Sequence, residues 1–513
     1  MKTIIWADIA IISSNLMPVE DFAVCVEDNY ILDTGSRQEM VTLYPDAKQV
    51  GDKNFIMIPA FVNSHDHGRG LGTASLGIQD DLLEIWMLGV RFQPKIDPYL
   101  AAAYDGIRQL RSGVGTTTHN QNPTNWSNVP VEADAILRAY RDVGIRVAFQ
   151  PIILDQNTLA YDNEHEFVAG LPKDVQRIAQ TYLDTPLPSK EDYFSMSLDL
   201  LNKYHDPVHH TTQVQVSPNG GQWCSDEITI AAVEFAQKHN TKVHMHMLET
   251  KYQRYYAINR WGKTFLRHLD DIGVLGPWLT LAHMIWVEDS DLSLLAERGV
   301  CIATNPGSNL RVRSGIASIA KFLKSGIPVG VGLDGYTIGE GQDFLRELRL
   351  AWTLCGRPGA NNLPIPSQLI WQMGWDMGAV VAMGKAPKLG KLIPGHLADL
   401  TLLDKQAIWG SWAPEGYPLK EKFSDLLLHL VEKSHVKHVM VNGEWVVWHG
   451  QATKIDEASI LLAIKDELSS QGLNKVSSDD SFRQLIPFLR DYYAKWHQSP
   501  EMRNTGIYNC ESL

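Results

Sequence analysis

The middle of the chain alternates short apolar runs with longer amphipathic stretches. Apolar or β-branched runs of strand length predict strands at 55–62, 114–119, 145–150, 212–216, 242–246, 279–283, 300–304 and 329–334. Helical spacing after these runs predicts helices at 98–111, 132–142, 190–204, 227–239, 263–271, 289–297, 316–324 and 343–354. Eight such units in about 300 residues predict an α/β chain built on a (β/α)8 barrel of the TIM type. An open doubly wound sheet is the alternative, but no Gly-rich phosphate turn follows the first strand.

Both ends of the chain are rich in strand patterns. Short apolar or alternating runs lie at 4–12, 22–26 and 30–34, and again at 400–403, 438–441 and 445–448, where Asn442-Gly443 predicts a turn. These runs flank the whole central pattern. We therefore expect the two ends to fold together as one discontinuous β module.

Two further segments have their own patterns. Residues 152–189 are polar and irregular, which predicts either a lid or binding loop or a solvated insertion. The tail predicts helices at 457–471 and 481–496, the second with an apolar face that must bury against the barrel or against another subunit. Pro487 predicts a kink or a helix start within that second helix.

Composition excludes several classes of function. Hydrophobic residues make up 44% and charged residues 20%, as in ordinary globular proteins, and the net charge of −13 argues against a nucleic-acid groove or an anionic membrane surface. The first residues lack the apolar core of a signal peptide, and no apolar run reaches membrane-spanning length. Five scattered cysteines without a C-x-x-C pair fit reduced thiols and a cytoplasmic location.

Histidines and a carboxylate fall at the carboxyl ends of several predicted strands. His65 and His67 follow the first strand, His246 and His283 end the fifth and sixth, and Asp334 ends the eighth. Barrel enzymes gather their chemistry at these strand ends. Three imidazoles and one carboxylate suit Zn²⁺ or Fe²⁺, so we assign His65, His67, His246 and Asp334 as ligands of one divalent metal, most readily zinc. Such a metal lowers the pKa of a bound water and makes hydroxide available.

Two neighbours are candidates for proton transfer. Glu249 follows His246 by three residues and could carry a proton from the water to a leaving nitrogen, while His283 could polarise the attacked group or orient the water. Asp334 could also serve as a base. Each has a structural alternative: a helix-start carboxylate for Glu249, a turn cap for Asp334, and carbonyl-bonded core histidines for His246 and His283. His244, two residues before the strand end, is expected to be such a core histidine.

Several motifs together resemble the amidohydrolase superfamily, and within it the nucleobase and aminotriazine deaminase–chlorohydrolase branch. They are the segments 59–67, 80–86, 113–118, 243–250, 281–283, 305–310, 332–335 and 394–400. The resemblance implies a (β/α)8 barrel with a split β-sandwich, hydrolysis of C–N or similar bonds on a ring, and a homo-oligomer. It divides the chain into 1–57 and 395–455 for the β-sandwich, 58–394 for the barrel, and 456–513 as a helical extension.

The resemblance also bears on the metal count and the substrate. Binuclear relatives bridge their metals with a carboxylated lysine at the fourth strand end, whereas residues 213–219 contain no lysine, which favours one metal. The segments Gly68-Arg69-Gly70, 219–223 and 335–340 depart from the familiar deaminases. By position in the loops, the candidate substrate-binding residues are Arg69, Trp86, Gln222, Trp223, Asn309, Arg311, Tyr336 and Glu340, with aromatic rings to stack on a planar ligand and arginine to bind a carbonyl or carboxylate.

The first functional hypothesis is therefore hydrolytic deamination of a small heterocycle, a cyclic amidine or nucleobase-like compound. A cyclic amidase or ring-forming ureide hydrolase of the dihydroorotase type, as in alkaloid or other secondary metabolism, would use similar ligands but release no ammonia. Displacement of chloride or an alkylamine is a third, related reaction. A catalytically inactive scaffold is the non-enzymatic alternative, and the complete ligand set argues against it.

Overall fold

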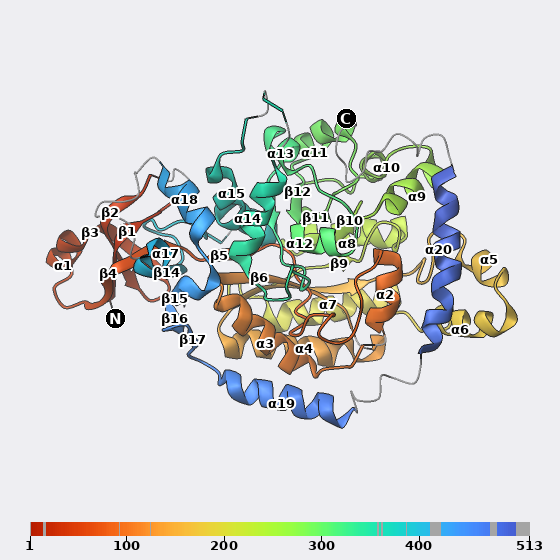
Figure 1. Cartoon of the computed structure of the whole chain (residues 1–513), viewed down its shortest axis with the longest axis horizontal. Helices are drawn as coiled ribbons and strands as arrows, with labels where there is room; N and C mark the ends of the chain where they lie inside the picture. The colour runs from red at the N-terminus through yellow and green to blue at the C-terminus, as the bar shows by residue number, and fades with distance from the viewer. Residues whose placement is uncertain are drawn as a thin grey trace.

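The computed structural model describes residues 2–13, 17–91, 93–123, 125–356, 359–360, 363–385, 387–410, 422–471 and 480–498. Cys510 and the last part of the predicted helical extension lie outside these residues. The described chain forms a TIM-barrel-like α/β core with a large sheet at one side (Figure 1).

The core consists of two parallel sheets. One contains β5 (Phe61–Asn63), β6 (Val114–Gln121), β7 (Arg146–Ile153) and β8 (Thr212–Val214), with the short β9 (Ser217–Pro218) beside β7. The other contains β10 (Val243–Met247), β11 (Leu279–His283), β12 (Cys301–Thr304) and β13 (Val329–Val331). A bridge between Val216 and Val243 joins the sheets at one junction, and Ser64 N donates to Val331 O over 2.9 Å at the other. The carboxyl ends of all these strands therefore face the same side of the molecule.

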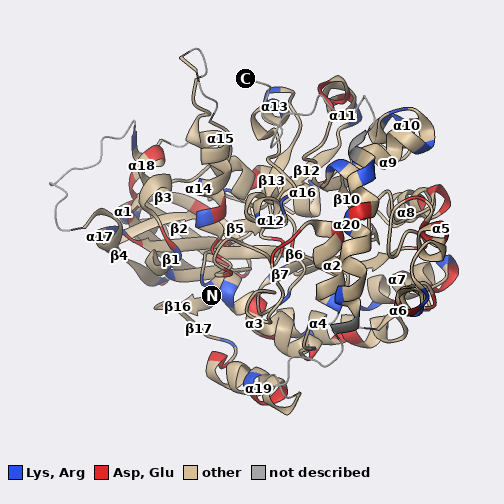
Figure 2. Ribbon diagram, turned by 45° about the vertical axis from the view of Figure 1, so that its right-hand side comes forward, with Lys and Arg blue, Asp and Glu red and all other residues tan. Residues whose placement is uncertain are grey.

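Helices follow the strands in the predicted alternation. The expected helices are α3 (Pro98–Leu110), α4 (Val129–Val143), α7 (Lys190–Tyr204), α8 (Asp226–Lys238), α10 (Phe265–Asp271), α11 (Leu292–Arg298), α13 (Ile319–Lys324) and α14 (Phe344–Leu354). Further helices are α1 (Arg37–Leu43), α2 (Leu83–Arg91), α9 (Lys251–Trp261), α12 (Pro306–Arg311), α15 (Ser367–Gly374), α16 (Asp376–Met383), α17 (Lys405–Trp409) and α18 (Phe423–Leu430). Acidic and basic side chains both occur on the outer helices, for example on α19 (Glu457–Ser470) (Figure 2). None of the described helices combines the length and apolar character needed to cross a membrane.

The two chain ends meet in one eight-stranded sheet. Its order is β17-β16-β15-β14-β4-β1-β2-β3. The strands are β1 (Lys2–Ala10), β2 (Val19–Glu27), β3 (Tyr30–Ser36), β4 (Lys48–Pro59), β14 (Leu400–Asp404), β15 (Val436–Val441), β16 (Glu444–Trp448) and β17 (Gln451–Ala452). The discontinuous β module expected from the sequence is therefore present.

The predicted strand 55–62 is in fact two strands, and the prediction of one strand was wrong. β4 ends at Pro59 and pairs with β14 in the terminal sheet, whereas Phe61 opens β5 and pairs with Val114. At the junction Ala60 N donates to Asp399 O over 3.1 Å. An uninterrupted apolar run does not reveal where a chain passes from one sheet to the next.

The segment 152–189 contains two helices, so the expectation of irregular structure there was wrong. They are α5 (Glu164–Ala169) and α6 (Lys173–Leu183). Only Val175, Ala179 and Tyr182 of α6 are buried, so its apolar stripe is narrow on an otherwise polar helix. A stripe of this kind is easily read as a polar loop.

The tail packs against its own chain. α20 (Ile486–Ala494) begins beside Pro487, which lies in its first turn, so Pro487 marks a helix start. Tyr493 of this helix is buried; its hydroxyl accepts a hydrogen bond from Tyr161 N over 3.2 Å, and its ring lies 4.7 Å from that of Tyr252. α20 lies beside α9 and α2, on the opposite side of the core from the terminal sheet (Figure 1). The apolar face of this helix therefore buries against the barrel side of the molecule.

Candidate metal centre and active site

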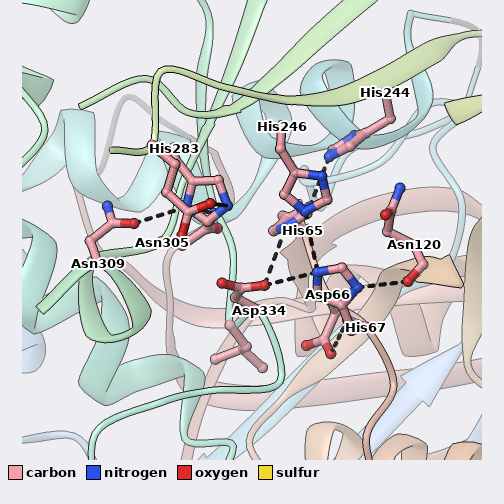
Figure 3. Close-up of polar contacts among 12 residues, drawn as sticks. His65, Asp66, His67, Asn120, His244, His246, His283, Asn305, Asn309 and Asp334 are labelled. Atoms are coloured by element: carbon pink, nitrogen blue, oxygen red, sulfur yellow. Dashed lines mark hydrogen bonds and ion pairs between the residues drawn. The ribbon is translucent and has the colours of Figure 1, made fainter. Parts of the chain in front are cut away.

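Four histidines and one aspartate converge at the carboxyl ends of the parallel strands. The Nε2 atoms of His65 and His67 each lie 3.2 Å from Asp334 Oδ1, and His246 Nε2 lies 3.3 Å from His67 Nε2 (Figure 3). His283, at the end of β11, faces the same space. All five side chains are buried. The strand-end positions thus bring together residues that are up to 269 positions apart, from His65 to Asp334.

The donor atoms fit a single divalent metal. Tetrahedral ligands at about 2.1 Å from a metal lie about 3.4 Å from one another, close to the separations of 3.2 and 3.3 Å observed here. His65 Nε2 is buried and makes no hydrogen bond. Two groups of atoms compact enough to bind an ion share His65: one with His67 and His246, the other with His283 and Asp334. The predicted ligands thus fall into two overlapping triads. In the second triad, His283 lies as close to His65 and Asp334 as a metal ligand would.

The remaining ring nitrogens fix how the histidines are oriented. His67 Nδ1 lies 2.8 Å from Asn120 O, and His246 Nδ1 lies 2.6 Å from Asn219 O, so both rings donate to carbonyls. His65 Nδ1 lies 2.8 Å from His244 Nε2, and the two imidazole rings are parallel. Nδ1–H groups held in this way leave Nε2 unprotonated and directed at the shared space, as in metal-binding histidines.

His244 differs from the sequence expectation. It was expected to bond to a carbonyl, but its Nε2 lies 2.8 Å from His65 Nδ1 instead. Burial lowers the pKa of His244 well below its ordinary 6.5, so the ring is neutral and can accept a hydrogen bond from His65.

Burial also sets the charge state of the other groups. It lowers the pKa of His65 to about 4 and that of His246 well below 6.5, so both are neutral near pH 7. Burial acts to raise the pKa of Asp334, but the close approach of the His65 and His67 rings outweighs it and holds this pKa well below 3.8. Neutral imidazoles and an ionised carboxylate are the forms that bind a metal.

The backbone is unusual where two of these residues leave their strands. His283 has φ of 74° and Asp334 has φ of 59°, in the left-handed region that side chains other than glycine rarely adopt. Asp334 N donates to His65 O over 2.9 Å, which holds the turn beside the first histidine. Conformations of this kind cost roughly 1–3 kcal/mol and cluster at functional sites.

Glu249 and His283 lie close together beside the cluster. Glu249 Oε2 lies 3.6 Å from His283 Nε2. Burial, with Asp334 nearby, raises the pKa of Glu249 well above 4.5, so this carboxyl holds a proton more readily than an exposed one. His283 Nδ1 lies 2.9 Å from Asn309 Oδ1, and burial lowers the pKa of His283. A neutral His283 that donates from Nδ1 presents Nε2 as an acceptor.

A cavity of about 630 Å³ opens from the cluster. His67, His246, Glu249, His283 and Asp334 form one end of it. The remaining walls are largely apolar and include Trp86 and Val90 of α2 and, from the segment 152–189, Tyr182 and Leu187. This volume is in the range of sites for small organic ligands.

The predicted substrate-binding residues divide into two groups. Arg69, Trp86 and Trp223 line the cavity. The residues Gln222, Asn309, Arg311, Tyr336 and Glu340 are not among those that line it. For these residues, direct contact with a substrate stays a prediction.

The second group supports the walls of the cavity. Asn309 accepts from His283, and Arg311 forms ion pairs with Asp80 at 2.9 Å and with Glu340 at 3.0 Å. The guanidinium of Arg311 also lies over the ring of Tyr336, 3.7 Å from its centroid. That ring in turn lies 4.8 Å from Trp86, which lines the cavity.

One histidine of the cavity was not predicted from the sequence. His119 lies near the end of β6 and lines the cavity, and its Nδ1 lies 2.8 Å from the hydroxyl of Tyr140. Burial lowers its pKa to about 3, so it is neutral. Its place near the end of the predicted strand 114–119 was the available signal.

Comparisons with known proteins identify the family of this chain. Residues 56–446 match the amidohydrolase family. A 5-methylthioadenosine/S-adenosylhomocysteine deaminase from Thermodesulfovibrio yellowstonii is 27% identical over 456 residues, which cover 86% of this chain and 92% of the relative.

Two solved structures share the fold. An adenosine deaminase from Xanthomonas campestris with bound zinc has a TM-score of 0.76 at 20% identity, covering 92% of this chain and 99% of its own. An atrazine chlorohydrolase from Arthrobacter aurescens TC1 in complex with zinc has a TM-score of 0.75 at 21% identity, covering 91% of this chain and 100% of its own. The family match spans most of the chain and includes every residue of the metal cluster, so this protein belongs to the amidohydrolase family.

Proposed function

We propose that this chain is a metal-dependent deaminase that hydrolyses the amino group from a small nitrogen-containing ring, a cyclic amidine or nucleobase-like compound. The observation that carries the proposal is the placement of Glu249 and His283, 3.6 Å apart, beside the histidine–aspartate cluster at the end of the cavity. The relatives named as deaminases of adenosine-type compounds support the same reaction.

The cluster is the site for one divalent metal in this proposal. His65, His67, His246 and Asp334 would hold it, and zinc suits these donors best, with Fe²⁺ as the alternative. The zinc in the related adenosine deaminase structure supports this choice. A bound metal supplies Lewis acidity and lowers the pKa of water at the site.

The chain's own residues then carry the protons. His283 Nε2 accepts a hydrogen bond and so orients the attacking water, because Asn309 holds the Nδ1 side of the ring. Asp334, which stays ionised, can take the first proton of that water. Glu249 holds a proton and delivers it to the ring amino group. The water oxygen bonds to the amidine carbon, the C–N bond breaks, and ammonia leaves.

Finer features of the architecture belong to the same proposal. We infer that the two parallel sheets act as the closed (β/α)8 barrel of 58–394, and that the terminal sheet is the β-sandwich of 1–57 and 395–455, with 456–513 as a helical extension. A cytoplasmic location and a homo-oligomer also remain proposals. The burial of Tyr493 within its own chain means that α20 offers no support for an oligomer.

The test is ammonia release by zinc-loaded protein across amino-substituted purines, pyrimidines, pterins, triazines and adenosine-type nucleosides. We expect release from at least one compound, and none from the same compound with Glu249→Gln. Ring opening without ammonia, or release of chloride or an alkylamine alone, would contradict deamination and favour the related hydrolases.

A further inference from the structure

Arg69 places a fixed guanidinium beside the metal cluster. It follows His67 by two residues, and Gly68 between them has φ of 59°, which turns the chain. The side chain crosses the turn after Asp334, because a Cβ on Gly335 would lie 3.1 Å from Arg69 Cγ. The guanidinium carbon lies 5.2 Å from the ring centroid of Trp86, and both side chains line the cavity. Contact with the indole therefore holds the cation in the cavity wall.

The guanidinium of Arg69 has no counterion in the part of the chain that the structure describes. No carboxylate there forms an ion pair with it, no hydrogen bond from it is made, and Nε is shielded from solvent. Two other arginines differ: the buried Arg146 pairs with Asp399 at 3.1 Å, and the partly buried Arg311 pairs with two carboxylates. A partly buried cation without a partner is costly, so an acceptor from outside the chain would stabilise this one.

A second donor in the same wall is also unsatisfied. Trp86 Nε1 is buried and makes no hydrogen bond. An indole N–H and a guanidinium can donate but cannot accept. Together they select a group that only accepts, and an anionic oxygen meets that requirement better than a hydroxyl or an amino group.

The nearby carboxyls do not supply this acceptor. Asp334 faces His65 and His67, and Glu249 faces His283. The third nearby carboxyl, Asp66, accepts hydrogen bonds from His67 N and Gly68 N and forms no ion pair with Arg69 among the described residues. A divalent metal in the cluster would add further positive charge. Together with the unpaired Arg69, that charge would favour an anion at this end of the cavity, although the whole chain has a net charge of −13.

We propose that the substrate is an amino-substituted ring that also carries an anionic oxygen, as a carboxylate or an ionised ring oxo group, and that Arg69 binds this oxygen with help from Trp86. The inference rests on the proposed function, which supplies the amino-substituted ring. Arg69 is then a specificity-determining residue, and its planar fork suits the two lone-pair directions of a carboxylate.

The test is calorimetric binding to zinc-loaded protein, which requires no turnover. One arm compares 4-aminopyrimidine-5-carboxylate with its neutral 5-carboxamide, and the other compares barbiturate, an acidic oxo ring, with uracil. We expect at least one anion to bind about tenfold or more tightly than its neutral partner, as a charge-assisted hydrogen bond predicts. The arm that shows the preference identifies the source of the oxyanion.

Variants assign the preference to a residue. Arg69→Met should bring anion and neutral partner to within about threefold of each other, while Arg69→Lys should retain part of the preference. Trp86→Phe should weaken the binding of the anion and leave the binding of its neutral partner unchanged. Arg313→Met, an exposed arginine that does not line the cavity, is the matched control and should bind as the wild type does. Metal content and the unfolding temperature verify that each variant folds; if Arg69→Met does not fold, Arg69→Lys and Trp86→Phe decide.

Four results would overturn the inference. Two concern the wild type: neither anion binds at millimolar concentration, or each neutral compound binds as tightly as its anionic partner. Two concern the variants: the preference for the anion survives Arg69→Met, or it is lost in Arg91→Met instead. Arg91 lines the same cavity, five residues or about 7.5 Å along α2 from Trp86. An anion preference without ammonia release from any ring would refute the proposed function and keep this inference. Ammonia release from neutral rings without an anion preference would refute this inference and keep the proposed function.

Discussion

At the scale of single residues, Glu249 should separate catalysis from metal binding. Its carboxyl faces His283 Nε2 at 3.6 Å and is not among the predicted ligands. Glu249→Gln keeps the shape of the side chain but removes the proton donor, so we expect turnover to fall by about 10²–10⁴-fold. Metal content and the unfolding temperature should stay at wild-type values. Near-normal turnover in this variant would remove Glu249 from the mechanism.

His244 should affect the metal without touching it. Its Nε2 lies 2.8 Å from His65 Nδ1, and as the acceptor of that hydrogen bond it would hold Nε2 of His65 toward the cluster. His244→Phe keeps a ring at this position but removes the acceptor, and we expect about 10–100-fold weaker metal binding in competition with a chelator. His239→Phe, on the half-buried end of α8, is the control. If both variants resist the chelator equally, His244 does not orient the ligand.

At this scale the sequence predicts those residues whose positions are dictated by strand ends. His65, His67, His246 and Asp334 could be placed together because parallel strands of a barrel end at one face. Asn309 and Arg311 could not be placed, because their partners depend on loop conformations that no periodicity encodes. The role of His244 likewise depends on a contact between strands far apart in sequence.

At the scale of elements, a buried carboxyl joins two helices beside the site. Glu347 of α14 is buried, and its Oε2 accepts a hydrogen bond from Gly307 N of α12 over 2.9 Å. Burial raises the pKa of Glu347 to about 7. The folded chain therefore retains this proton between about pH 4.5 and pH 7, where the unfolded chain releases it.

Folding stability should accordingly fall as the pH rises through that window. The stabilising contribution of the protonated carboxyl is fully present below pH 4.5 and is lost by pH 7, at about 1.4 kcal/mol per pKa unit or about 3 kcal/mol in all. Glu347→Gln should remove this part of the pH dependence, measured as the difference from wild type in denaturant unfolding at several pH values. Parallel pH profiles for the two proteins would show that Glu347 does not titrate in this way.

The elements also show where sequence patterns are informative. Strong periodicity placed the barrel strands and their main helices within a few residues, as for β11 at Leu279–His283. The split between β4 and β5 and the helix α6 were missed because both depend on tertiary contacts. A continuous apolar run and a narrow apolar stripe do not indicate those contacts.

At the scale of the whole molecule, one buried ion pair ties the terminal sheet to the core. Arg146 at the start of β7 pairs with both oxygens of Asp399, which precedes β14, and Asp399 also accepts from Asn442 N over 2.7 Å. Both charged side chains are almost fully buried. Removal of one partner leaves the other charge uncompensated.

Arg146→Met should therefore destabilise the fold by about 3–5 kcal/mol in denaturant unfolding. The double variant Arg146→Met with Asp399→Leu should recover part of the loss, because it leaves no buried charge. Arg138→Met, which breaks an exposed pair with Asp134, should cost less than about 1 kcal/mol. Equal effects of Arg146→Met and Arg138→Met would show that this ion pair does not join the two sheets.

The central claim is that one metal held by the strand-end histidines and Asp334 supports deamination. The most direct test restores zinc stepwise to metal-free protein and measures ammonia release from the best substrate of the ring panel against bound metal per chain. The account predicts that release rises in proportion to bound zinc up to one per chain and then stays constant. Release that is independent of zinc, that requires two metals per chain, or that is absent from every ring at full metal occupancy would contradict it.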